Sequence, residues 1–475
     1  MIALDHLKGR RVAVFGLRRT GLSAARALAS GGARPLLWDD DARRRTSAER
    51  EGFELAEPAR LDWTGVALLV LSPGVPYDPK PHPVVRLARE AGVEIVCDIE
   101  LLQRAQPEAC FVGITGTNGK STTTALIGHI LQRHKMAVAV GGNIGRPALD
   151  LPALGPGGIY ALELSSYQLD LGRALAFDVG VLTNITPDHL DRHGSMAAYA
   201  ACKRKIFRAR GKASVAVLGV DDEETRAIHR ALVEERGRRI VAVAVGHSLA
   251  DGVAVIDGTL YEFADGRRSP VVDLGQAPAL HGAHNWQNGA CAFAVARALG
   301  VPSALAAGAI LAFPGLPHRI ETVAMVAGVR FVNDSKATNA DAAGKALACF
   351  ERVFWIAGGR PKPGGLSGLE RFYPRIAHAF LIGEAAPSFA ETLKGRVPLT
   401  VAGTLARALG EAFAMARSEA QARGSAVVLL SPACASFDQF TDYEARGEAF
   451  RRLCLELEGK AGGAARRDAA QRAAS

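Results

Sequence analysis

Residues 109–124 combine the side chains that bind nucleotide phosphates. They read ACFVGITGTNGKSTTT, an apolar strand-like run followed by a Gly-rich turn that ends in Lys120 and Ser121. Gly116 and Gly119 allow the turn to coil so that backbone N–H groups converge on an anion, and the positive end of the following helix adds to the attraction. Lys120 can reach the β- and γ-phosphates, while the Ser121 hydroxyl can bind Mg²⁺. The stretch predicts a nucleotide-phosphate loop, although it departs from the common P-loop pattern at the first glycine.

Polar residues also follow the next two predicted strands. Glu163 ends an apolar run in LELSSYQL, and the segment 184–193, NITPDHLDRH, places His189 among acidic neighbours. Carboxylate and imidazole groups near a phosphate site suggest metal binding or proton transfer. The residue pattern alone favours a solvated or capping role for Glu163 and leaves a structural turn open for 184–193.

A lysine lies within a predicted helix that is otherwise apolar on one face. In YAACKRKIF, residues 199–207, Lys203 shares that face with Tyr199 and Phe207. An inward-pointing lysine is costly unless it is paired or chemically modified. Spacing alone therefore favours a solvated Lys203.

Four polar loops lie next to predicted strands near the C-terminus. They are HRIE (318–321), NDSKATN (333–339), GGRPKPGG (358–365) and SPACASFDQF (431–440). Their Arg, Lys and hydroxyl groups suit anionic ligands. Because ligands of open α/β sheets bind at the carboxyl ends of strands, we expect these loops to form one site.

The elements that must position these residues alternate between strand and helix patterns, which predicts an α/β protein of three domains. Residues 1–98 are expected to form a Rossmann-like domain, residues 99–314 a central P-loop ATPase-like domain with short hairpins over 252–275, and residues 315–458 a second Rossmann-like domain. The Pro/Gly cluster at 314–317 is the expected linker. The Ala/Gly/Arg-rich tail, 459–475, is expected to be disordered.

The first predicted turn raises a second possibility for cofactor binding. Gly16 and Gly21 flank it with the spacing GxxxxG, and Asp39 ends the next predicted strand, where a ribose-binding acid could lie. The missing GxGxxG pattern argues against an NAD-dependent oxidoreductase. Another nucleotide-binding turn and a purely architectural turn both stay open.

Composition restricts the remaining classes. The chain has 475 residues, 48% of them hydrophobic and 22% charged, with a net charge of +9. Aromatic residues make up 6% and the arginines are scattered, which argues against nucleic-acid binding and favours a basic surface for anionic substrates. The seven cysteines form no CxxC pair, as expected for reduced thiols in a cytoplasmic protein. No signal peptide or membrane insertion is expected.

Taken together, these motifs resemble the Mur ligase family of ATP-dependent amide-forming enzymes over all of the chain except its tail. The resemblance rests on TGTNGKST (115–122), YxxxKxxIF (199–207), HNWQN (284–288), NDSKATN (333–339) and SPACASFDQF (431–440). The last two segments look like the D-glutamate-adding branch. The DNPR-type signature of the diaminopimelate-adding branch is missing.

The resemblance implies an enzyme of cytoplasmic peptidoglycan precursor synthesis. It would use ATP to join D-glutamate to UDP-N-acetylmuramoyl-L-alanine through an acyl phosphate, as a monomer with two Mg²⁺ ions. It implies catalytic roles for Lys120, His189 and a carbamylated Lys203. The implied ATP-binding residues are Gly116, Thr117, Asn118, Gly119, Lys120, Ser121, Thr122, Asn288, Arg319, Asp334 and Lys336. The implied substrate-binding residues are Thr20, Ser72, Asn143, Thr338, Lys362, Ser436, Phe437 and Tyr443, and the implied metal ligands are Ser121, Glu163, His189 and Lys203.

Three other functions fit part of the same pattern. A relative that adds a different amino acid, including a folylpolyglutamate-type synthetase, would differ in its response to the amino-acid substrate. An ATPase switch would consume ATP without either co-substrate. An oxidoreductase built on residues 11–40 would bind nicotinamide.

Overall fold

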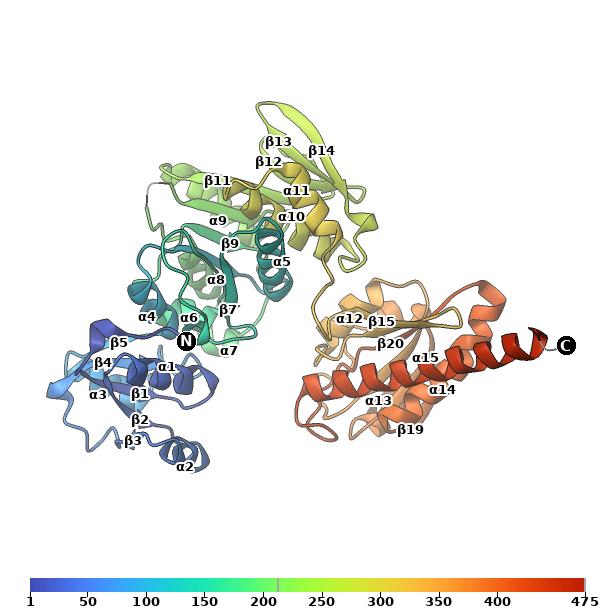
Figure 1. Cartoon of the computed structure of the whole chain (residues 1–475), viewed down its shortest axis with the longest axis horizontal. Coiled ribbons are helices and arrows are strands. Elements are labelled where there is room, and N and C mark those ends of the chain that lie inside the picture. Colours follow the sequence, from blue (N-terminus) through green and yellow to red (C-terminus); the bar gives the residue numbers. More distant parts are fainter. Residues whose placement is uncertain (212, 474–475) are drawn as a thin grey trace. The chain divides into compact units, whose positions relative to one another are not determined.

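The protein contains three β-sheets within two compact units, Met1–Phe313 and Pro314 onward (Figure 1). The computed structural model describes residues 1–211 and 213–473, with side chains up to residue 459. The division falls at the start of the predicted Pro/Gly linker.

The first sheet is parallel, with the strand order β3-β2-β1-β4-β5. Its strands are β1 (Arg11–Phe15), β2 (Arg34–Trp38), β3 (Glu54–Leu55), β4 (Val66–Leu71) and β5 (Glu94–Val96). Its helices are α1 (Arg19–Ser30), α2 (Ala42–Arg50), α3 (Pro83–Glu90) and α4 (Asp98–Ala105). Because β2, β1 and β4 are neighbours, the loops after these three strands meet at one edge of the sheet.

The second sheet has nine strands in the order β14-β13-β12-β11-β10-β9-β6-β8-β7. Its strands are β6 (Cys110–Thr115), β7 (Val138–Gly142), β8 (Ile159–Glu163), β9 (Val179–Leu182), β10 (Val215–Gly219), β11 (Arg239–Val245), β12 (Gly252–Ile256), β13 (Thr259–Ala264) and β14 (Arg267–Asp273). The last three are antiparallel to their neighbours within the group, which confirms the hairpins predicted over 252–275. Strand β6, which leads into the phosphate loop, pairs in parallel with β8 and β9.

Seven helices belong to this second sheet in the described part of the chain. They are α5 (Lys120–Arg133), α6 (Ser166–Leu171), α7 (Leu190–His193), α8 (Met196–Arg204), α9 (Glu223–Glu235), α10 (Ala283–Ala298) and α11 (Ser303–Leu311). Helices α10 and α11 pack against α5, so the helix that starts at the phosphate loop is buried along one side.

The third sheet has the order β15-β16-β20-β17-β18-β19 and is parallel except for β15. Its strands are β15 (Glu321–Val326), β16 (Val329–Asn333), β17 (Val353–Gly358), β18 (Ile376–Ile382), β19 (Leu399–Gly403) and β20 (Ala426–Leu430). Its helices are α12 (Ala340–Ala348), α13 (Ala386–Leu393), α14 (Leu405–Arg423) and α15 (Tyr443–Ala473).

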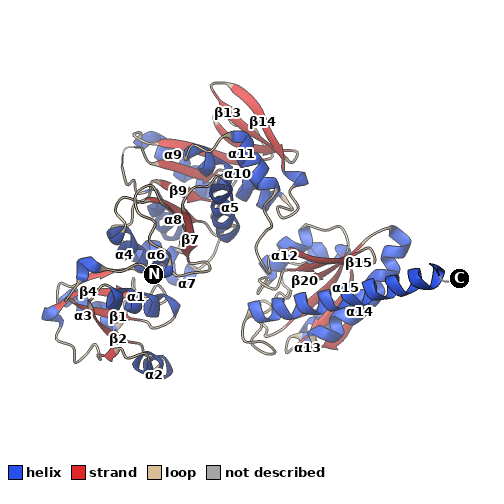
Figure 2. Cartoon of the chain, viewed as in Figure 1, coloured by secondary structure: helices blue, strands red, loops and turns tan. Residues whose placement is uncertain are grey.

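Alternation along β17 explains why this third sheet has helices on both faces. Trp355 packs in a core cluster with residues of α12 and α13, whereas Phe354 and Ile356 pack in a second cluster with residues of α14 and α15. Successive side chains of a strand point to opposite faces, so a strand buried along its whole length needs two layers of helices. Figure 2 shows these helices around the strands of the third sheet.

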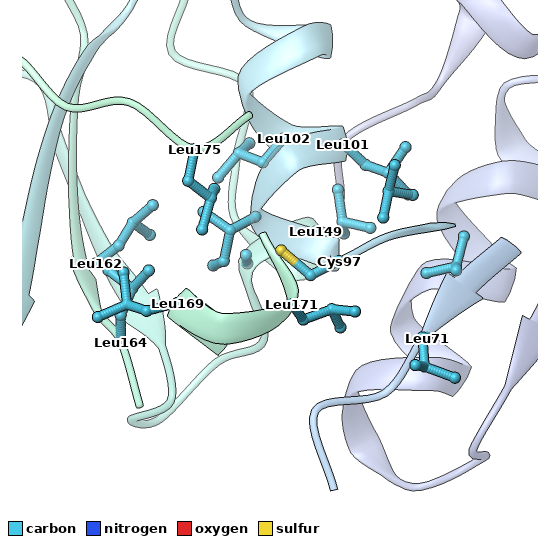
Figure 3. Close-up of a cluster of buried hydrophobic side chains, with 14 of the residues drawn as sticks. Leu71, Cys97, Leu101, Leu102, Leu149, Leu162, Leu164, Leu169, Leu171 and Leu175 are labelled. Atoms are coloured by element: carbon cyan, nitrogen blue, oxygen red, sulfur yellow. The ribbon is translucent and has the colours of Figure 1, made fainter. Parts of the chain in front are cut away.

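The first and second sheets share one hydrophobic core, although the sequence predicted separate domains divided at residue 98. The shared cluster contains Leu71 of β4, Leu101 of α4, Leu162 of β8, and Leu149 from the segment between β7 and β8 (Figure 3). Burial of leucines from both sheets in one cluster makes them a single compact unit. The sequence patterns missed this because each pattern reports which residues are buried but not against which partner.

Helix α15 extends to Ala473, so residues 459–473 are helical rather than disordered as predicted. Ala, Arg and Gln, which make up much of this segment, have high intrinsic helix propensities. Residues 474 and 475, the end of that predicted tail, lie outside the described residues. Within the described residues, every helix is too short or too polar to cross a lipid bilayer.

Asp98, the first residue of α4, is a fully buried acid between the first two sheets. Burial raises the pKa of Asp98 to about 6, while hydrogen bonds from the Ile99 N–H and the Gln168 side chain act in the opposite direction. The folded protein therefore retains a proton that an unfolded chain releases near pH 4. This proton stabilises the folded state below about pH 4, and the contribution is lost as the pH rises through about 6.

We expect Asp98→Asn to become more stable relative to the wild type as the pH rises from 4 to 6.5, because asparagine cannot ionise. The relative free energy of unfolding should change by up to about 3 kcal/mol over this range. Urea unfolding at several pH values measures it. A difference that stays constant from pH 4 to 6.5 would show that Asp98 does not hold the extra proton.

Candidate active site

The phosphate loop is compressed between β9 and α10. Gly116 has a φ of +152° and Gly119 a φ of +83°. Residues other than glycine rarely adopt these backbone angles. A methyl group on Gly116 would lie 1.9 Å from Thr183 Oγ1, and one on Gly119 would lie 2.0 Å from Asn288 Oδ1. Both glycines are therefore required by space as well as by backbone conformation.

Asn184, which follows β9, holds the backbone of this loop. Its carbonyl accepts the Thr117 N–H at 2.8 Å, and its Oδ1 accepts the Asn118 N–H at 2.9 Å. The Lys120 ammonium folds back onto the carbonyls of Gly116 and Thr117, at 3.0 and 2.9 Å. Asn184 thus fixes two loop amides, while the lysine makes contacts within the loop that a bound phosphate would have to replace.

Lys203 is buried, contrary to the solvated position that its spacing favoured. Its side chain lies on α8 with 1% exposure, Nζ donates to the Gly116 carbonyl at 2.8 Å, and Nζ lies 4.7 Å from the centre of the Tyr199 ring. Burial, followed by the positive charge of Lys120, lowers the pKa of Lys203 to about 7. The helical spacing correctly paired it with Tyr199, but it could not show that β6 and its loop cover this face.

Glu163 is also buried, with 3% exposure, rather than solvated. Its Oε1 accepts a hydrogen bond from Asn143 Nδ2 at 2.8 Å. Its Oε2 has no hydrogen-bond partner among the described residues. A buried carboxylate oxygen without a donor is unfavourable unless a cation or proton meets it.

His189 lies on the loop between β9 and α7 in a left-handed backbone conformation, with a φ of +52°. Its Nδ1 is 3.1 Å from the Tyr167 hydroxyl, and its Nε2 is 3.4 Å from Asp188 Oδ2. The side chain is 46% exposed. The loop after β9 therefore presents an accessible imidazole beside the phosphate loop.

A cavity of about 720 Å³ connects these residues to the edge of the first sheet. Six of the predicted site residues line it: Thr20, Ser72, Lys120, Asn143, His189 and Lys203. The cavity is thus built by loops that follow strands of both sheets in the first unit. Its lining carries basic side chains, among them Lys120 and Lys203, and the acidic side chains Asp39, Asp40 and Asp41 of the first sheet.

At the first-sheet end of the cavity, Asp39 is occupied by contacts within the protein. Its carboxylate accepts the Leu17 N–H at 2.6 Å and the Asp41 N–H at 2.9 Å, and it contacts Arg44 at 3.2 Å. Burial raises the pKa of Asp39, but these hydrogen bonds outweigh burial and lower it below its usual value. Asp39 therefore ties the turn after β1 to the loop after β2, which favours the architectural reading over a ribose-binding acid.

The remaining predicted residues of the first unit lie along the start of α5. Ser121 is buried in its first turn, followed by Thr122. Asn288 of α10 is 2% exposed, and its Oδ1 accepts a hydrogen bond from Thr123 Oγ1 at 3.3 Å. Asn288 thus packs against the phosphate loop and bonds the helix that follows it. Its predicted contact with ATP stays a prediction.

In the second unit, the predicted residues follow three neighbouring strands. Asp334, Lys336 and Thr338 follow β16, Lys362 follows β17, and Ser436, Phe437 and Tyr443 follow β20. Lys362 Nζ lies 3.5 Å from Thr338 Oγ1, and Lys336 Nζ lies 3.8 Å from the centre of the Tyr443 ring. The structure therefore brings both lysines to the carboxyl edge of this sheet, next to the buried Ser436 and the exposed Phe437.

Asp334 is the buried acid of this edge. It accepts a hydrogen bond from Ser431 Oγ at 2.7 Å and one from the Ile320 N–H at 3.3 Å. Burial raises the pKa of Asp334 to about 7, although Ser431, Ile320 and the charge of Arg319 act to lower it. Asp334 joins the β16 and β20 loops to the segment that carries Arg319.

The sequence patterns missed Arg446, which organises this edge from α15. It is 1% exposed, and its guanidinium donates to the Ser335 side chain and carbonyl at 3.0 and 2.9 Å and to the Cys434 carbonyl at 3.1 Å. It therefore joins the loops that follow β16 and β20 and leaves a buried positive charge beneath them. An arginine in the first turns of a helix gives no local signal of this role.

No three His, Cys, Asp or Glu side chains cluster closely enough to hold a metal ion in the described part of the chain. A Mg²⁺ site here would therefore depend on hydroxyl, carbamate or phosphate oxygens in addition to Glu163. The donor set fits, because Mg²⁺ prefers oxygen ligands and Glu163 Oε2 is buried without a partner.

Comparison with known proteins agrees with this arrangement. A family model described as the Mur ligase middle domain matches residues 114–296. The UDP-N-acetylmuramate-alanine ligase MurC from Thermotoga maritima aligns with a TM-score of 0.56 at 17% identity, covering 95% of this chain and 99% of that one. The MurF ligase from the same organism, solved in complex with ADP, aligns with a TM-score of 0.54 at 18% identity, covering 97% and 98%. These likenesses define a Mur ligase-type α/β fold.

Sequence identity is much higher to one branch. A UDP-N-acetylmuramoylalanine--D-glutamate ligase from Phenylobacterium zucineum is 52% identical over 464 residues, covering 96% of this chain and 98% of the relative. The chain belongs to the family of UDP-N-acetylmuramoylalanine--D-glutamate ligases within the Mur ligases, and it is an enzyme of the ligase class. The resemblance inferred from the motifs is confirmed.

Proposed function

We propose that this protein uses ATP to join D-glutamate to UDP-N-acetylmuramoyl-L-alanine, through an acyl phosphate, in peptidoglycan precursor synthesis. The observation that carries the proposal is the single cavity that runs from the first-sheet loops to Lys120, His189 and Lys203. A nucleotide-sugar substrate is elongated and anionic, so it fits a cavity with basic groups at the phosphate-loop end. The relatives' shared name supplies the identity of the substrates.

The chemistry proceeds in two displacements. The alanyl carboxylate oxygen attacks the γ-phosphorus, the bond from that phosphorus to the β–γ bridging oxygen breaks, and ADP leaves. The amine of D-glutamate then attacks the acyl carbon, inorganic phosphate leaves, and the amine releases a proton. Lys120 would stabilise the charge on the transferred phosphoryl group after exchanging its loop carbonyls for phosphate oxygens.

We propose that two Mg²⁺ ions bind, one held by Ser121 and Glu163 and the second by His189 and a carbamate on Lys203. Bound there, Mg²⁺ would neutralise the phosphate oxygens. Lys203 suits carbamylation because its amine is buried, with only the Gly116 carbonyl and the Thr115 hydroxyl as hydrogen-bond acceptors for its charge among the described residues. Carbamylation retains one N–H for the Gly116 carbonyl and replaces the buried cation with an anion.

The second unit would receive D-glutamate at the carboxyl edge of its sheet. Lys362 supplies a positive charge for a carboxylate, and Thr338 and Ser436 supply hydroxyl groups on the same edge. Phe437 is 61% exposed and Tyr443 lies against Lys336. Arg319, Asp334 and Lys336 stay predicted ATP contacts.

The proposal is tested by measuring phosphate release with ATP, Mg²⁺, UDP-N-acetylmuramoyl-L-alanine and D-glutamate, omitting each component in turn. We expect release only with the complete mixture, and loss of release when L-alanine, L-lysine or L-glutamate replaces D-glutamate. ATP consumption that proceeds equally without both co-substrates would instead identify an ATPase switch.

Lys120→Ala should lower the turnover rate by at least about 100-fold, because it removes the cation that meets the transferred phosphate. Steady-state phosphate release measures the effect. Lys394→Ala, which removes an exposed lysine after α13, is the matched control and should keep wild-type turnover. Retention of activity in Lys120→Ala would remove Lys120 from the proposed mechanism.

Lys203→Ala should be inactive, and added formate or acetate should restore much of its turnover by supplying the missing carboxylate. Lys205→Ala is the control on the same turn, since it loses a lysine paired with Asp170 at 3.0 Å and should not respond to the added acids. Phosphate release over a range of acid concentrations measures rescue. A lack of rescue at every concentration would count against a carbamate at Lys203.

A further inference from the structure

Tyr167 is a polar side chain of the cavity that the proposed mechanism leaves without a role. It lies in the first turn of α6, four residues after Glu163 ends β8. Its hydroxyl is 3.1 Å from His189 Nδ1, and the two rings are 5.0 Å apart. Tyr167 and Glu163 therefore belong to one strand-to-helix turn, and Tyr167 meets His189 from the neighbouring loop.

The position of the Tyr167 ring is fixed by packing. The ring stacks on His193 at 5.9 Å with an interplanar angle of 25°, and the Arg192 guanidinium lies 5.3 Å from its centre. The start of α6 is fixed by a capping box in which Ser165 and Gln168 bond each other's backbone N–H groups. Removal of the hydroxyl alone should leave this ring packing in place, because phenylalanine keeps the same shape.

The hydroxyl contacts the ring nitrogen that faces away from a possible ligand site at Nε2. A neutral histidine carries its proton on one ring nitrogen and offers a lone pair at the other. When Nδ1 carries the proton and donates to the Tyr167 oxygen, Nε2 offers its lone pair. Asp188, whose Oδ2 lies 3.4 Å from Nε2, favours the opposite tautomer. The Tyr167 contact is the shorter of the two, and it lies within hydrogen-bonding distance.

We propose that Tyr167 is a positioning residue that accepts the Nδ1–H of His189, so that Nε2 is available to a divalent cation. The proposal rests on the assignment of His189 as a metal ligand in the proposed function. Partners of this kind fix both the tautomer and the orientation of a metal-binding imidazole. His189 needs such a partner because it lies just before the four-residue helix α7 and its side chain is half exposed, so packing alone does not fix the orientation of its ring.

The first test is the tautomer of His189 in the metal-free protein. We expect ¹⁵N-labelled histidine spectra at pH 8 to show a proton on Nδ1 in the wild type, with the signal assigned by its loss in His189→Gln. In Tyr167→Phe the population should move toward the Nε2–H form, because Asp188 is then the remaining partner of the ring. An Nε2–H tautomer in the wild type, or identical spectra in both proteins, overturns the proposal.

The second test is the affinity for Mn²⁺ alone, measured from the electron paramagnetic resonance signal of the free ion in bicarbonate buffer. Tyr167→Phe should bind Mn²⁺ at least about 10-fold more weakly than the wild type, as is typical when a partner of a metal-binding histidine is removed. Wild-type affinity in Tyr167→Phe overturns the proposal, whatever the spectra show.

Tyr160→Phe is the matched control. Its hydroxyl donates to the Pro152 carbonyl at 2.8 Å, away from the cavity lining, and its removal should change neither the His189 spectrum nor the Mn²⁺ affinity. Both readouts are independent of substrates. Failure of phosphate release in the wild type would therefore contradict the proposed function, whereas unchanged spectra or Mn²⁺ affinity in Tyr167→Phe contradicts the role of Tyr167 alone.

Discussion

The close packing of Thr183 and Asn288 against the glycines of the phosphate loop determines much of the site. Because neither Gly116 nor Gly119 has room for a methyl group, the loop backbone is held between β9 and α10. The same strand end supplies Asn184, which binds two loop amides. A backbone fixed on both sides can present its N–H groups to a phosphate without paying the full entropy of ordering a flexible loop.

That fixed loop also brings two lysines to one carbonyl. Lys120 and Lys203 both donate to the Gly116 oxygen, and the proximity of their charges helps to lower the pKa of Lys203. Two ammonium groups at one neutral oxygen repel each other, so an anion at either position is favourable. A phosphate bound to Lys120 and a carbamate formed at Lys203 would each reduce the repulsion between the two ammonium groups. The nearby Glu163 has one buried oxygen without a hydrogen-bond partner among the described residues, which adds a reason for a cation to join them.

The sequence predicts local features of this protein better than contacts between distant segments. The alternation of strands and helices, the hairpins over 252–275 and the spacing of Tyr199 and Lys203 follow from local periodicity. Burial of Lys203 and Glu163 does not, because it depends on which strands pair with β6. The shared core of the first two sheets and the role of Arg446 likewise arise from partners far away in the chain. The helical end of α15 departs from the prediction for a different reason, because its composition is compatible with both helix and disorder.

Arg446 holds the loops at the carboxyl edge of the third sheet in place through contacts within the second unit. The guanidinium donates to backbone and hydroxyl oxygens of two loops, and no hydrogen bond to a carboxylate is among its contacts within the described residues. A buried arginine without a paired carboxylate is costly, as its lowered pKa of about 10 indicates, with burial as the main cause. The negative charges of Asp438 and Asp334 act to raise the pKa of Arg446, so they offset part of this cost. The remaining cost is met by hydrogen bonds to two separate loops, which is why one buried guanidinium can hold the ends of β16 and β20 together without a ligand.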